Sequence, residues 1–255
     1  MGCSIERMKV LILEPELESS HKVLEEFAEV KVGPRDRKYT EDELVKEIED
    51  VDAVIITSRD RISKRVIYAA KRLKVITKYG AKPSFENVDI EAATERSIPV
   101  TWTPESGSDS VAEHAITLML VLLKNIMDST QHLKMGGWRD EPLVGNELLG
   151  KTVGIIGFGA IGRRVAKKLQ GFDVRIIVYD PYVPEDSVKQ VGGEAVDLNC
   201  LLKKSDIITI HASLSHETKG LIGVKELHAM KKSAILVNTS RGAIIDENAL
   251  YNALK

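Results

Sequence analysis

The stretch TVGIIGFGAIGRRVAKKLQGFDVRIIVYD, residues 152–180, places a glycine-rich turn between an apolar strand pattern and an amphipathic helix pattern. Its glycines follow the spacing G-x-G-x-x-G at Gly157, Gly159 and Gly162. The first glycine permits a tight turn, the second lets the backbone approach a pyrophosphate, and the third lets the helix pack against the strand. The stretch therefore predicts a βαβ unit that binds a dinucleotide at a helix N-terminus.

The residue that ends the second strand of this unit favours NAD over NADP. Asp180 closes the pattern VRIIVYD, eighteen residues after Gly162. A carboxylate there can accept hydrogen bonds from both hydroxyls of the adenosine ribose and would repel a 2′-phosphate. Pro181 and Tyr182 follow, so no basic residue stands where a 2′-phosphate would need one. NAD is the expected cofactor.

Short strand patterns alternate with helix patterns on both sides of this unit, as is typical of parallel sheets covered by helices. Residues 8–104 predict a doubly wound α/β substrate domain of five strands, flavodoxin-like in strand order. Residues 105–255 predict a second doubly wound α/β domain, the Rossmann domain that binds NAD. The break between them is TPESGSDS, residues 103–110, which is rich in Pro, Gly and Ser. Within the first domain, Thr40 and Glu43 have the capping-box spacing that begins a helix.

One predicted helix, VAEHAITLMLVLLKNIM at residues 111–127, is apolar on nearly all sides. Ser110 and Glu113 have capping-box spacing at its start. Such a helix must be covered on more than one side, either inside the chain or by a second subunit. We favour a homodimer through the 110–127 helix over burial within the chain. The apolar run AITLMLVLL is about half the length needed to span a bilayer, so no membrane association is expected.

The composition argues against several classes of partner. The 255 residues carry 36 basic and 38 acidic side chains, interspersed, for a formal charge of −2. No single-sign field attracts nucleic acid or anionic lipid, so we expect a small-molecule ligand. Cys3 and Cys200 are the only cysteines. They are too few for a disulfide framework or a thiolate metal site, which fits a reducing cytoplasm.

Several segments together resemble the D-isomer-specific 2-hydroxyacid dehydrogenases, with phosphoglycerate dehydrogenase the nearest in character. The matching segments cover almost the whole chain: YGAKPSFENVDIEAA, SVAEHAITLMLVLLKN, ELLGKTVGIIGFGAIGRRVAKKL with VYDPY, SDIITIHASLSHETKGLIG and MKKSAILVNTSRGAIIDENAL. The resemblance implies two α/β domains with a cleft between them. It also implies an NAD-dependent oxidoreductase that transfers a hydride between the cofactor and a D-2-hydroxy acid or its 2-oxo acid.

The resemblance assigns part of the first domain to the substrate. Tyr79, Gly80 and Ala81 match a glycine loop whose backbone N–H groups cradle the substrate carboxylate. Ser58 and Arg59 follow a neighbouring strand and are expected to lie on the same side of the domain. Ser58 is expected to contact the substrate, whereas a solvated side chain is a nearly equal interpretation of Arg59.

Arg241 matches the family's catalytic arginine, which pairs with the substrate carboxylate and polarises the carbonyl or hydroxyl oxygen. A guanidinium suits this role because it offers several donors in a fixed fork. The segment NTSRG also follows a strand, at the end where open α/β sheets bind ligands. The alternative interpretation is a surface arginine in a loop.

The resemblance assigns the cofactor to residues spread over the second domain: Gly157, Gly159, Ala160, Ile161, Gly162, Asp180, His211, Thr239 and Arg241. Ala160 and Ile161 are expected at the pyrophosphate, and Thr239, with the backbone near Arg241, at the nicotinamide. His211 ends the strand pattern DIITIHA and is expected to line the cofactor crevice rather than to act as an acid.

The chain departs from the usual family pattern at three places. Ser213 stands where proline is common, Trp102 stands where a smaller polar residue is frequent, and Lys82-Pro83 replace a second loop glycine. These departures leave the shape of the substrate open, including whether it carries a phosphate.

The proton-transfer pair of the family, a histidine supported by a glutamate, is expected downstream of the arginine. None of the 6 histidines stands on a matching motif, and the sequence reaches Lys255 before either residue is expected. We interpret the chain as an incomplete copy without the C-terminal strands, in which AILVN becomes an exposed sheet edge. Two alternatives stay open: a non-catalytic NAD-binding regulator, and a truncated product without function.

Overall fold

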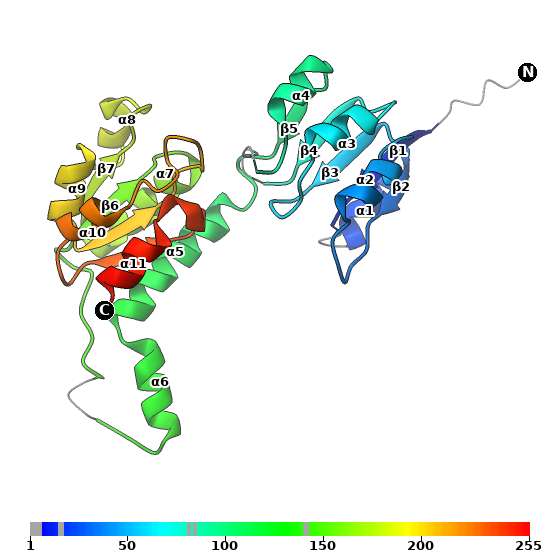
Figure 1. Cartoon of the computed structure of the whole chain (residues 1–255). Helices are drawn as coiled ribbons and strands as arrows, with labels where there is room; N and C mark the ends of the chain where they lie inside the picture. Colours follow the sequence, from blue (N-terminus) through cyan, green and yellow to red (C-terminus); the bar gives the residue numbers. More distant parts are fainter. Residues whose placement is uncertain (1–6, 15–17, 81–82, 84–85, 140–142) are drawn as a thin grey trace, which may run out of the picture. The chain divides into compact units, whose positions relative to one another are not determined.

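The computed structural model describes residues 7–14, 18–80, 83, 86–139 and 143–255. The chain divides into two compact units, residues 1–106 and 107–255. The sequence predicted this break two residues earlier, after residue 104. Each unit contains a parallel sheet of five strands with helices packed on it (Figure 1).

The first unit has a flavodoxin-like sheet, as the sequence predicted. Its strands run parallel in the order β2-β1-β3-β4-β5. In this order the chain winds first to one side of β1 and then to the other. The elements are β1 (Met8–Ile12), α1 (Glu18–Glu25), β2 (Ala28–Val32), α2 (Glu41–Glu47), β3 (Ala53–Ile56), α3 (Lys64–Ala69), β4 (Val75–Lys78), α4 (Ile90–Glu95) and β5 (Val100–Trp102).

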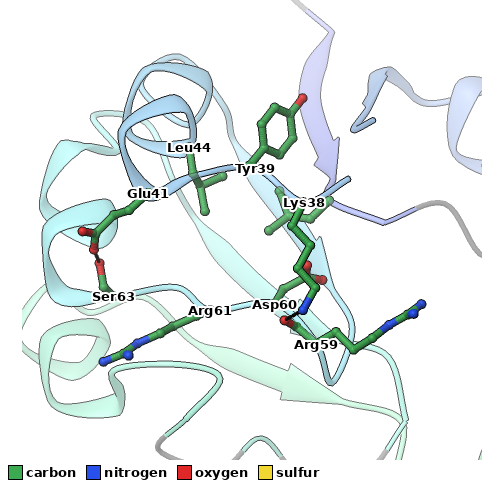
Figure 2. A pocket seen from close by; sticks show the side chains of 9 residues that line it. Lys38, Tyr39, Glu41, Leu44, Arg59, Asp60, Arg61 and Ser63 are labelled. Atoms are coloured by element: carbon green, nitrogen blue, oxygen red, sulfur yellow. Dashed lines mark hydrogen bonds between the residues drawn. The ribbon is translucent and has the colours of Figure 1, made fainter. Parts of the chain in front are cut away.

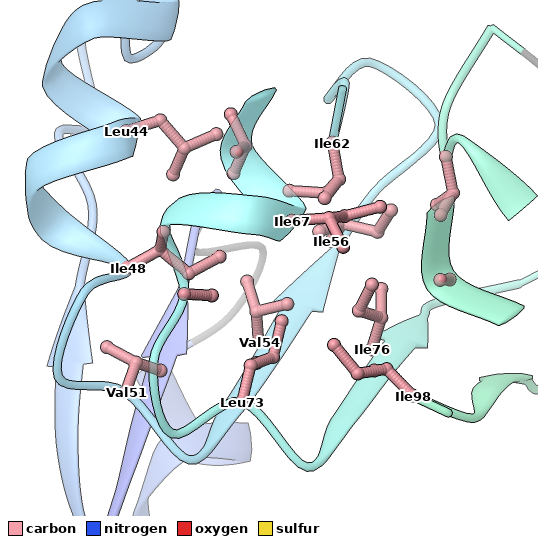
Figure 3. Packing of buried hydrophobic residues seen from close by; sticks show 14 of the residues in the cluster. Leu44, Ile48, Val51, Val54, Ile56, Ile62, Ile67, Leu73, Ile76 and Ile98 are labelled. Atoms are coloured by element: carbon pink, nitrogen blue, oxygen red, sulfur yellow. The ribbon is translucent and has the colours of Figure 1, made fainter. Parts of the chain in front are cut away.

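Alternate residues of these strands form the main core of the first unit, because successive side chains of a strand point to opposite faces. Val54 and Ile56 of β3 and Ile76 of β4 are fully shielded from solvent. They pack with α2, α3 and α4, and Figure 3 shows Leu44 of α2 in the same cluster. A smaller cluster on the other face packs against Leu24 of α1. Helices thus cover both faces of the sheet, and the loops that carry the predicted substrate residues follow the carboxyl ends of its strands.

The second unit has the strand order of a Rossmann fold. Its strands run parallel in the order β10-β9-β6-β7-β8. The chain crosses over β6 between β8 and β9, which creates a topological switch point between β6 and β9. The elements are α5 (Ser108–Leu123), α6 (Ile126–Lys134), β6 (Thr152–Ile156), α7 (Ala160–Leu169), the 3₁₀ helix η2 (Gln170–Phe172), β7 (Arg175–Tyr179), α8 (Glu185–Lys189), β8 (Glu194–Ala195), α9 (Leu198–Lys204), β9 (Ile207–Ile210), α10 (Val224–Ala229), β10 (Ile235–Asn238), the 3₁₀ helix η3 (Gly242–Ile244) and α11 (Glu247–Ala253).

Helices cover both faces of this second sheet. α5 and α7 belong to the cluster on one face, and α9, α10 and α11 belong to the cluster on the other. Strand β10 lies at one edge of the sheet, as predicted for AILVN. Its residues Ile235 and Leu236 are partly exposed. The carboxyl ends of β6, β7, β9 and β10 therefore share one edge, from which the predicted cofactor residues follow.

The two predicted helix starts have different outcomes. Thr40 Oγ1 accepts a hydrogen bond from Glu43 N at 3.3 Å, and the Glu43 carboxylate accepts one from Thr40 N at 2.9 Å, which confirms the capping box of α2. The start predicted at Ser110 is wrong, because α5 begins at Ser108. It follows Gly107, which has a φ of 77° and no side chain to cap the helix. Glycine adopts this left-handed conformation without steric cost.

The helix predicted over residues 111–127 is two helices. α5 and α6 are bent by 59° at a break where Asn125 has a φ of 51°. One side of α5, including Ala115 and Met119, is buried within the unit against α7 and the sheet. Burial within the chain thus accounts for that side of the helix. Among the described residues no single helix is long and apolar enough to cross a membrane, and only the bent pair α5 and α6 reaches the required length and composition.

Candidate functional site

Two glycines of the turn after β6 are required by backbone packing alone. Gly157 has a φ of 89°, and a Cβ on it would lie 2.5 Å from the backbone nitrogen of Ala212. A Cβ on Gly162 would lie 2.2 Å from the carbonyl oxygen of Gly157. Both distances are far inside van der Waals contact. A side chain at either position would therefore push strand, turn and helix apart.

The middle glycine instead borders open space. A Cβ built on Gly159 would meet no atom within 4 Å. Gly159 is the N-cap of α7, a helix of 10 residues whose start has no side-chain cap. The first N–H groups of the helix, beginning with those of Ala160 and Ile161, have no intrahelical acceptor, and the helix dipole favours an anion beside them. The space beside Gly159 therefore fits the phosphates of a dinucleotide.

The carboxylate of Asp180 is held against this turn at the end of β7. Its Oδ2 accepts a hydrogen bond from Phe158 N at 2.7 Å, and its Oδ1 accepts one from Tyr182 N at 2.9 Å. The side chain is partly exposed. Each carboxylate oxygen thus retains acceptor capacity for a ribose hydroxyl, and the fixed negative charge opposes a 2′-phosphate.

His211 follows β9, and its side chain is partly buried. Its Nε2 lies 2.9 Å from Thr209 Oγ1, and its Nδ1 lies 3.5 Å from Thr239 Oγ1. Burial lowers the pKa of His211 to about 4. The imidazole is therefore uncharged at neutral pH, where it is a poor proton donor. These contacts support a role in packing and in lining the cofactor site.

Arg241 lies in the loop after β10, on the same edge of the sheet. Asn238 braces this loop: its Nδ2 donates to Arg241 O at 2.9 Å, and its Oδ1 accepts from Ser240 N at 3.0 Å and Ser240 Oγ at 2.7 Å. The guanidinium itself donates only to Ser240 O, at 2.9 Å, and no described carboxylate pairs with it. Most of its donors remain for an anionic ligand.

The predicted substrate residues of the first unit follow β3 and β4, which are adjacent in its sheet. Ser58 is exposed, and the Tyr79 side chain is 52% exposed. Arg59 is exposed too, but its guanidinium forms an ion pair with Glu14. Ala81 lies outside the described residues. Ser58, Tyr79 and Gly80 thus lie at one sheet edge, as their order along the chain predicts.

The two described backbone N–H groups of this glycine loop, those of Tyr79 and Gly80, already have acceptors. Tyr79 N donates to Ile56 O at 2.8 Å, which continues the pairing of β4 with β3, and Gly80 N donates to Thr103 Oγ1 at 2.8 Å. Sequence reasoning missed Thr103, because it lies 23 residues from Gly80 and no local spacing links them. A substrate carboxylate bound at Gly80 N would have to displace the Thr103 hydroxyl.

Comparison with known proteins connects these two sheets to one family. The family model described as D-isomer specific 2-hydroxyacid dehydrogenase, NAD binding domain, matches residues 116–255. The chain belongs to this family. Membership confirms the resemblance drawn from the sequence motifs, the α/β fold and NAD as the cofactor.

Individual members of the 2-hydroxyacid dehydrogenase family match nearly the whole chain. It is 43% identical to D-3-phosphoglycerate dehydrogenase of Methanocaldococcus jannaschii and 38% identical to glyoxylate reductase of Thermococcus litoralis, each over 97% of this chain. These matches cover 47% of the first relative and 76% of the second, so the chain spans about half the length of the former. The structure of NAD-dependent formate dehydrogenase from Staphylococcus aureus in complex with NAD superposes with a TM-score of 0.82 at 33% identity, over 97% of this chain and 78% of that one.

Separate substitutions of Gly159 and Gly162 should show that one glycine serves NAD binding and the other serves folding stability. Gly159→Ala adds a methyl group where no atom lies within 4 Å. Thermal unfolding should therefore stay unchanged, while NADH should bind at least about tenfold more weakly, because the methyl occupies the phosphate position. Gly162→Ala should lower the free energy of unfolding by about 1 to 3 kcal/mol through backbone overlap. Circular dichroism and NADH fluorescence titration measure the two effects, and undiminished NADH binding by Gly159→Ala would contradict the site.

The buried His211 predicts a loss of stability in acid. Its folded pKa of about 4 lies below the usual 6.5, so the unfolded chain binds more protons between these two values. The stability contribution is full above pH 6.5 and is lost as the pH falls toward 4. Because glutamine cannot take the proton, His211→Gln should remove up to about 3 kcal/mol of this pH dependence. Urea unfolding of both chains from pH 4 to 8 tests this, and parallel profiles would refute it.

Proposed function

We propose that the chain is an NAD-dependent oxidoreductase that acts on the CH–OH group of a D-2-hydroxy acid, or on the corresponding 2-oxo acid. Bound NAD supplies the hydride acceptor, or donor in the reduced form. The observation that carries the proposal is Arg241, a guanidinium without a described carboxylate partner on the same sheet edge as the glycine turn. The names of the relatives, D-3-phosphoglycerate dehydrogenase and glyoxylate reductase, support it.

In this proposal Arg241 binds the substrate carboxylate and polarises the reacting oxygen. Charge-assisted hydrogen bonds of this kind contribute about 1.5 to 3 kcal/mol each. The Asn238 contacts hold the loop of Arg241 before substrate arrives, so little ordering cost falls on binding. On the first unit, Ser58 and the loop of Tyr79, Gly80 and Ala81 are the residues that we propose for substrate binding. That step exchanges the Gly80 to Thr103 hydrogen bond for one to the substrate.

One observation favours a second candidate function. Reduction of a 2-oxo acid needs a proton donor, and His211, whose pKa is about 4, does not serve at neutral pH. With His211 neutral, the anion-binding arginine and the nucleotide turn of the described residues would also suit a regulator that senses NAD and a carboxylate without turnover. Both candidates require NAD binding, and only the first requires catalysis.

The test is turnover of a panel of 2-oxo acids with NADH, by residues 1–255 and by Arg241→Gln. The oxidoreductase proposal expects turnover that falls by about 10² to 10³ in kcat/KM in the variant, because a donor to the developing oxyanion is lost. NADH affinity should remain within about threefold, since Asp180 and the glycine turn are intact. The matched control is Lys167→Gln, at an exposed basic residue of α7. If neither chain turns over any substrate but both still bind NADH, the oxidoreductase proposal is wrong and the regulator is the candidate that remains.

We further propose a homodimer built on α6 and the end of α5. The described residues there expose an unusual series of large apolar side chains: Leu122, Ile126, Met127, Leu133, Met135 and Trp138. Exposed large apolar side chains that gather in one region are typical of interaction sites. The scarcity of cysteine fits a cytoplasmic location, which we also propose.

A charge at the centre of this surface should separate the subunits. Met127→Glu places a carboxylate where the dimer would exclude water, so the dimer dissociation constant should rise at least about 100-fold. Val224→Glu, at an exposed apolar residue of α10, is the control and should leave the dimer intact. Sedimentation velocity measures the result. A monomeric wild type, or equal dissociation of both variants, would refute the interface.

A further inference from the structure

A cavity of about 400 Å³ opens in the first unit, and Arg59 is among the residues that line it. Figure 2 shows the side chains that line it. They come from the segments after β1, β2 and β3, and include Leu13, Lys38, Tyr39, Asp60, Arg61 and Ser63. Ser58, Tyr79 and Gly80 do not line it. The cavity therefore lies outside the function proposed above.

Its location is the one where sheets of this topology bind ligands. The chain leaves β1 for β2 on one side and returns to β3 on the other, so the switch point lies between β1 and β3. Leu13 directly follows β1, and Asp60 and Arg61 lie in the segment after β3. In open α/β sheets, ligands occupy the crevice outside the carboxyl ends of the strands at such a point.

The acidic side chains at this cavity are already engaged within the protein. Asp60 is buried, and its Oδ2 accepts hydrogen bonds from Thr57 N at 2.7 Å and Thr57 Oγ1 at 3.1 Å. Glu41 accepts a hydrogen bond from the Ser63 hydroxyl. Glu14 pairs with Arg59 at the cavity border. Each of these carboxylates thus has a hydrogen-bond or ion-pair partner within the protein.

Two cations at the cavity have no such partner. Lys38 Nζ donates to the carbonyl oxygen of Arg59 at 2.7 Å, and no described carboxylate pairs with it. Arg61 has neither an ion pair nor a side-chain hydrogen bond among the described residues. Figure 2 shows Lys38 and Arg61 on different sides of the pocket, with Tyr39 and Leu44 above them in this view. Two basic side chains without a described ion-pair partner thus lie beside a partly apolar wall.

We propose that this cavity binds a small organic anion, with phosphate or carboxylate groups held by Lys38 and Arg61. The volume exceeds that of a single ion and falls within the range of small-molecule sites. Leu13, Leu44 and Tyr39 provide contact for the carbon part of the ligand. Charge-assisted bonds from an ammonium and a guanidinium give it selectivity for anions over neutral analogues.

Calorimetric titration of the whole chain with inorganic phosphate and with citrate, at constant ionic strength, tests the site. Both Lys38→Gln and Arg61→Gln should weaken binding by about tenfold or more, because each removes a charge-assisted contact. Lys46→Gln is the matched control, since Lys46 is an exposed lysine of α2 that does not line the cavity. Arg241→Gln separates this site from the proposed substrate site of the second unit.

Binding that is lost in Lys38→Gln and Arg61→Gln but kept in Lys46→Gln and Arg241→Gln supports the proposal, and the stronger probe identifies the preferred group. Absence of saturable binding to the wild type overturns it. Equal loss in Lys46→Gln, or loss confined to Arg241→Gln, overturns it as well. Because Lys38 and Arg61 are exposed, both variants should keep the wild-type unfolding temperature, which is measured alongside.

Discussion

The close approach of backbone to backbone at the turn after β6 is the constraint on which the second unit depends. Gly157 and Gly162 leave no room for a side chain, and Gly157 N donates to Tyr179 O at 2.9 Å, which ties the turn to β7. Once strand, turn and helix are packed this closely, the start of α7 is fixed over the sheet edge. Gly159 then has open space beside uncapped N–H groups. Gly157 and Gly162 are thus required for the packing of the fold, whereas Gly159 provides space for a ligand.

The sequence predicted the fold well where a local pattern determines structure. Strand and helix alternation predicted both sheets, and the spacing of Thr40 and Glu43 predicted the start of α2. It failed where backbone conformation alone decides. Gly107 and Asn125 both have positive φ, and they start α5 early and end it early. The hydrophobic pattern carries no information on such single-residue conformations. A continuous apolar run therefore predicted one long helix where the structure has two.

The site residues could be named from motifs, but their partners could not. His211 depends on Thr209 and Thr239, and Gly80 on Thr103. These partners come from neighbouring strands or distant loops, where the sheet order places them. The neutrality of His211 follows from burial, which a strand-end position in the sequence does not reveal. The roles of substrate residues stay predictions, whereas the scaffold that presents them is described.

Sheet order also arranges charge along the edge of the second unit. Reading from β7 to β10 across β6 and β9, the edge presents the Asp180 carboxylate, the free N–H groups of α7, the neutral His211 and then the Arg241 guanidinium. Neighbouring strands are about 4.8 Å apart, so the strands β7 and β10, which precede these two opposite charges, lie three strand spacings or roughly 14 Å apart. The groups along this edge thus suit different parts of a ligand. The carboxylate can bind hydroxyl groups, the backbone amides can bind phosphates, and the guanidinium can bind an acid. A molecule with a ribose at one end and a reacting carboxylic acid beyond the other would meet each group in turn. A charged His211 would place a second cation along that edge and would weaken the distinction between its two ends. The burial that keeps His211 uncharged therefore leaves the Arg241 guanidinium as the cation at that end of the edge.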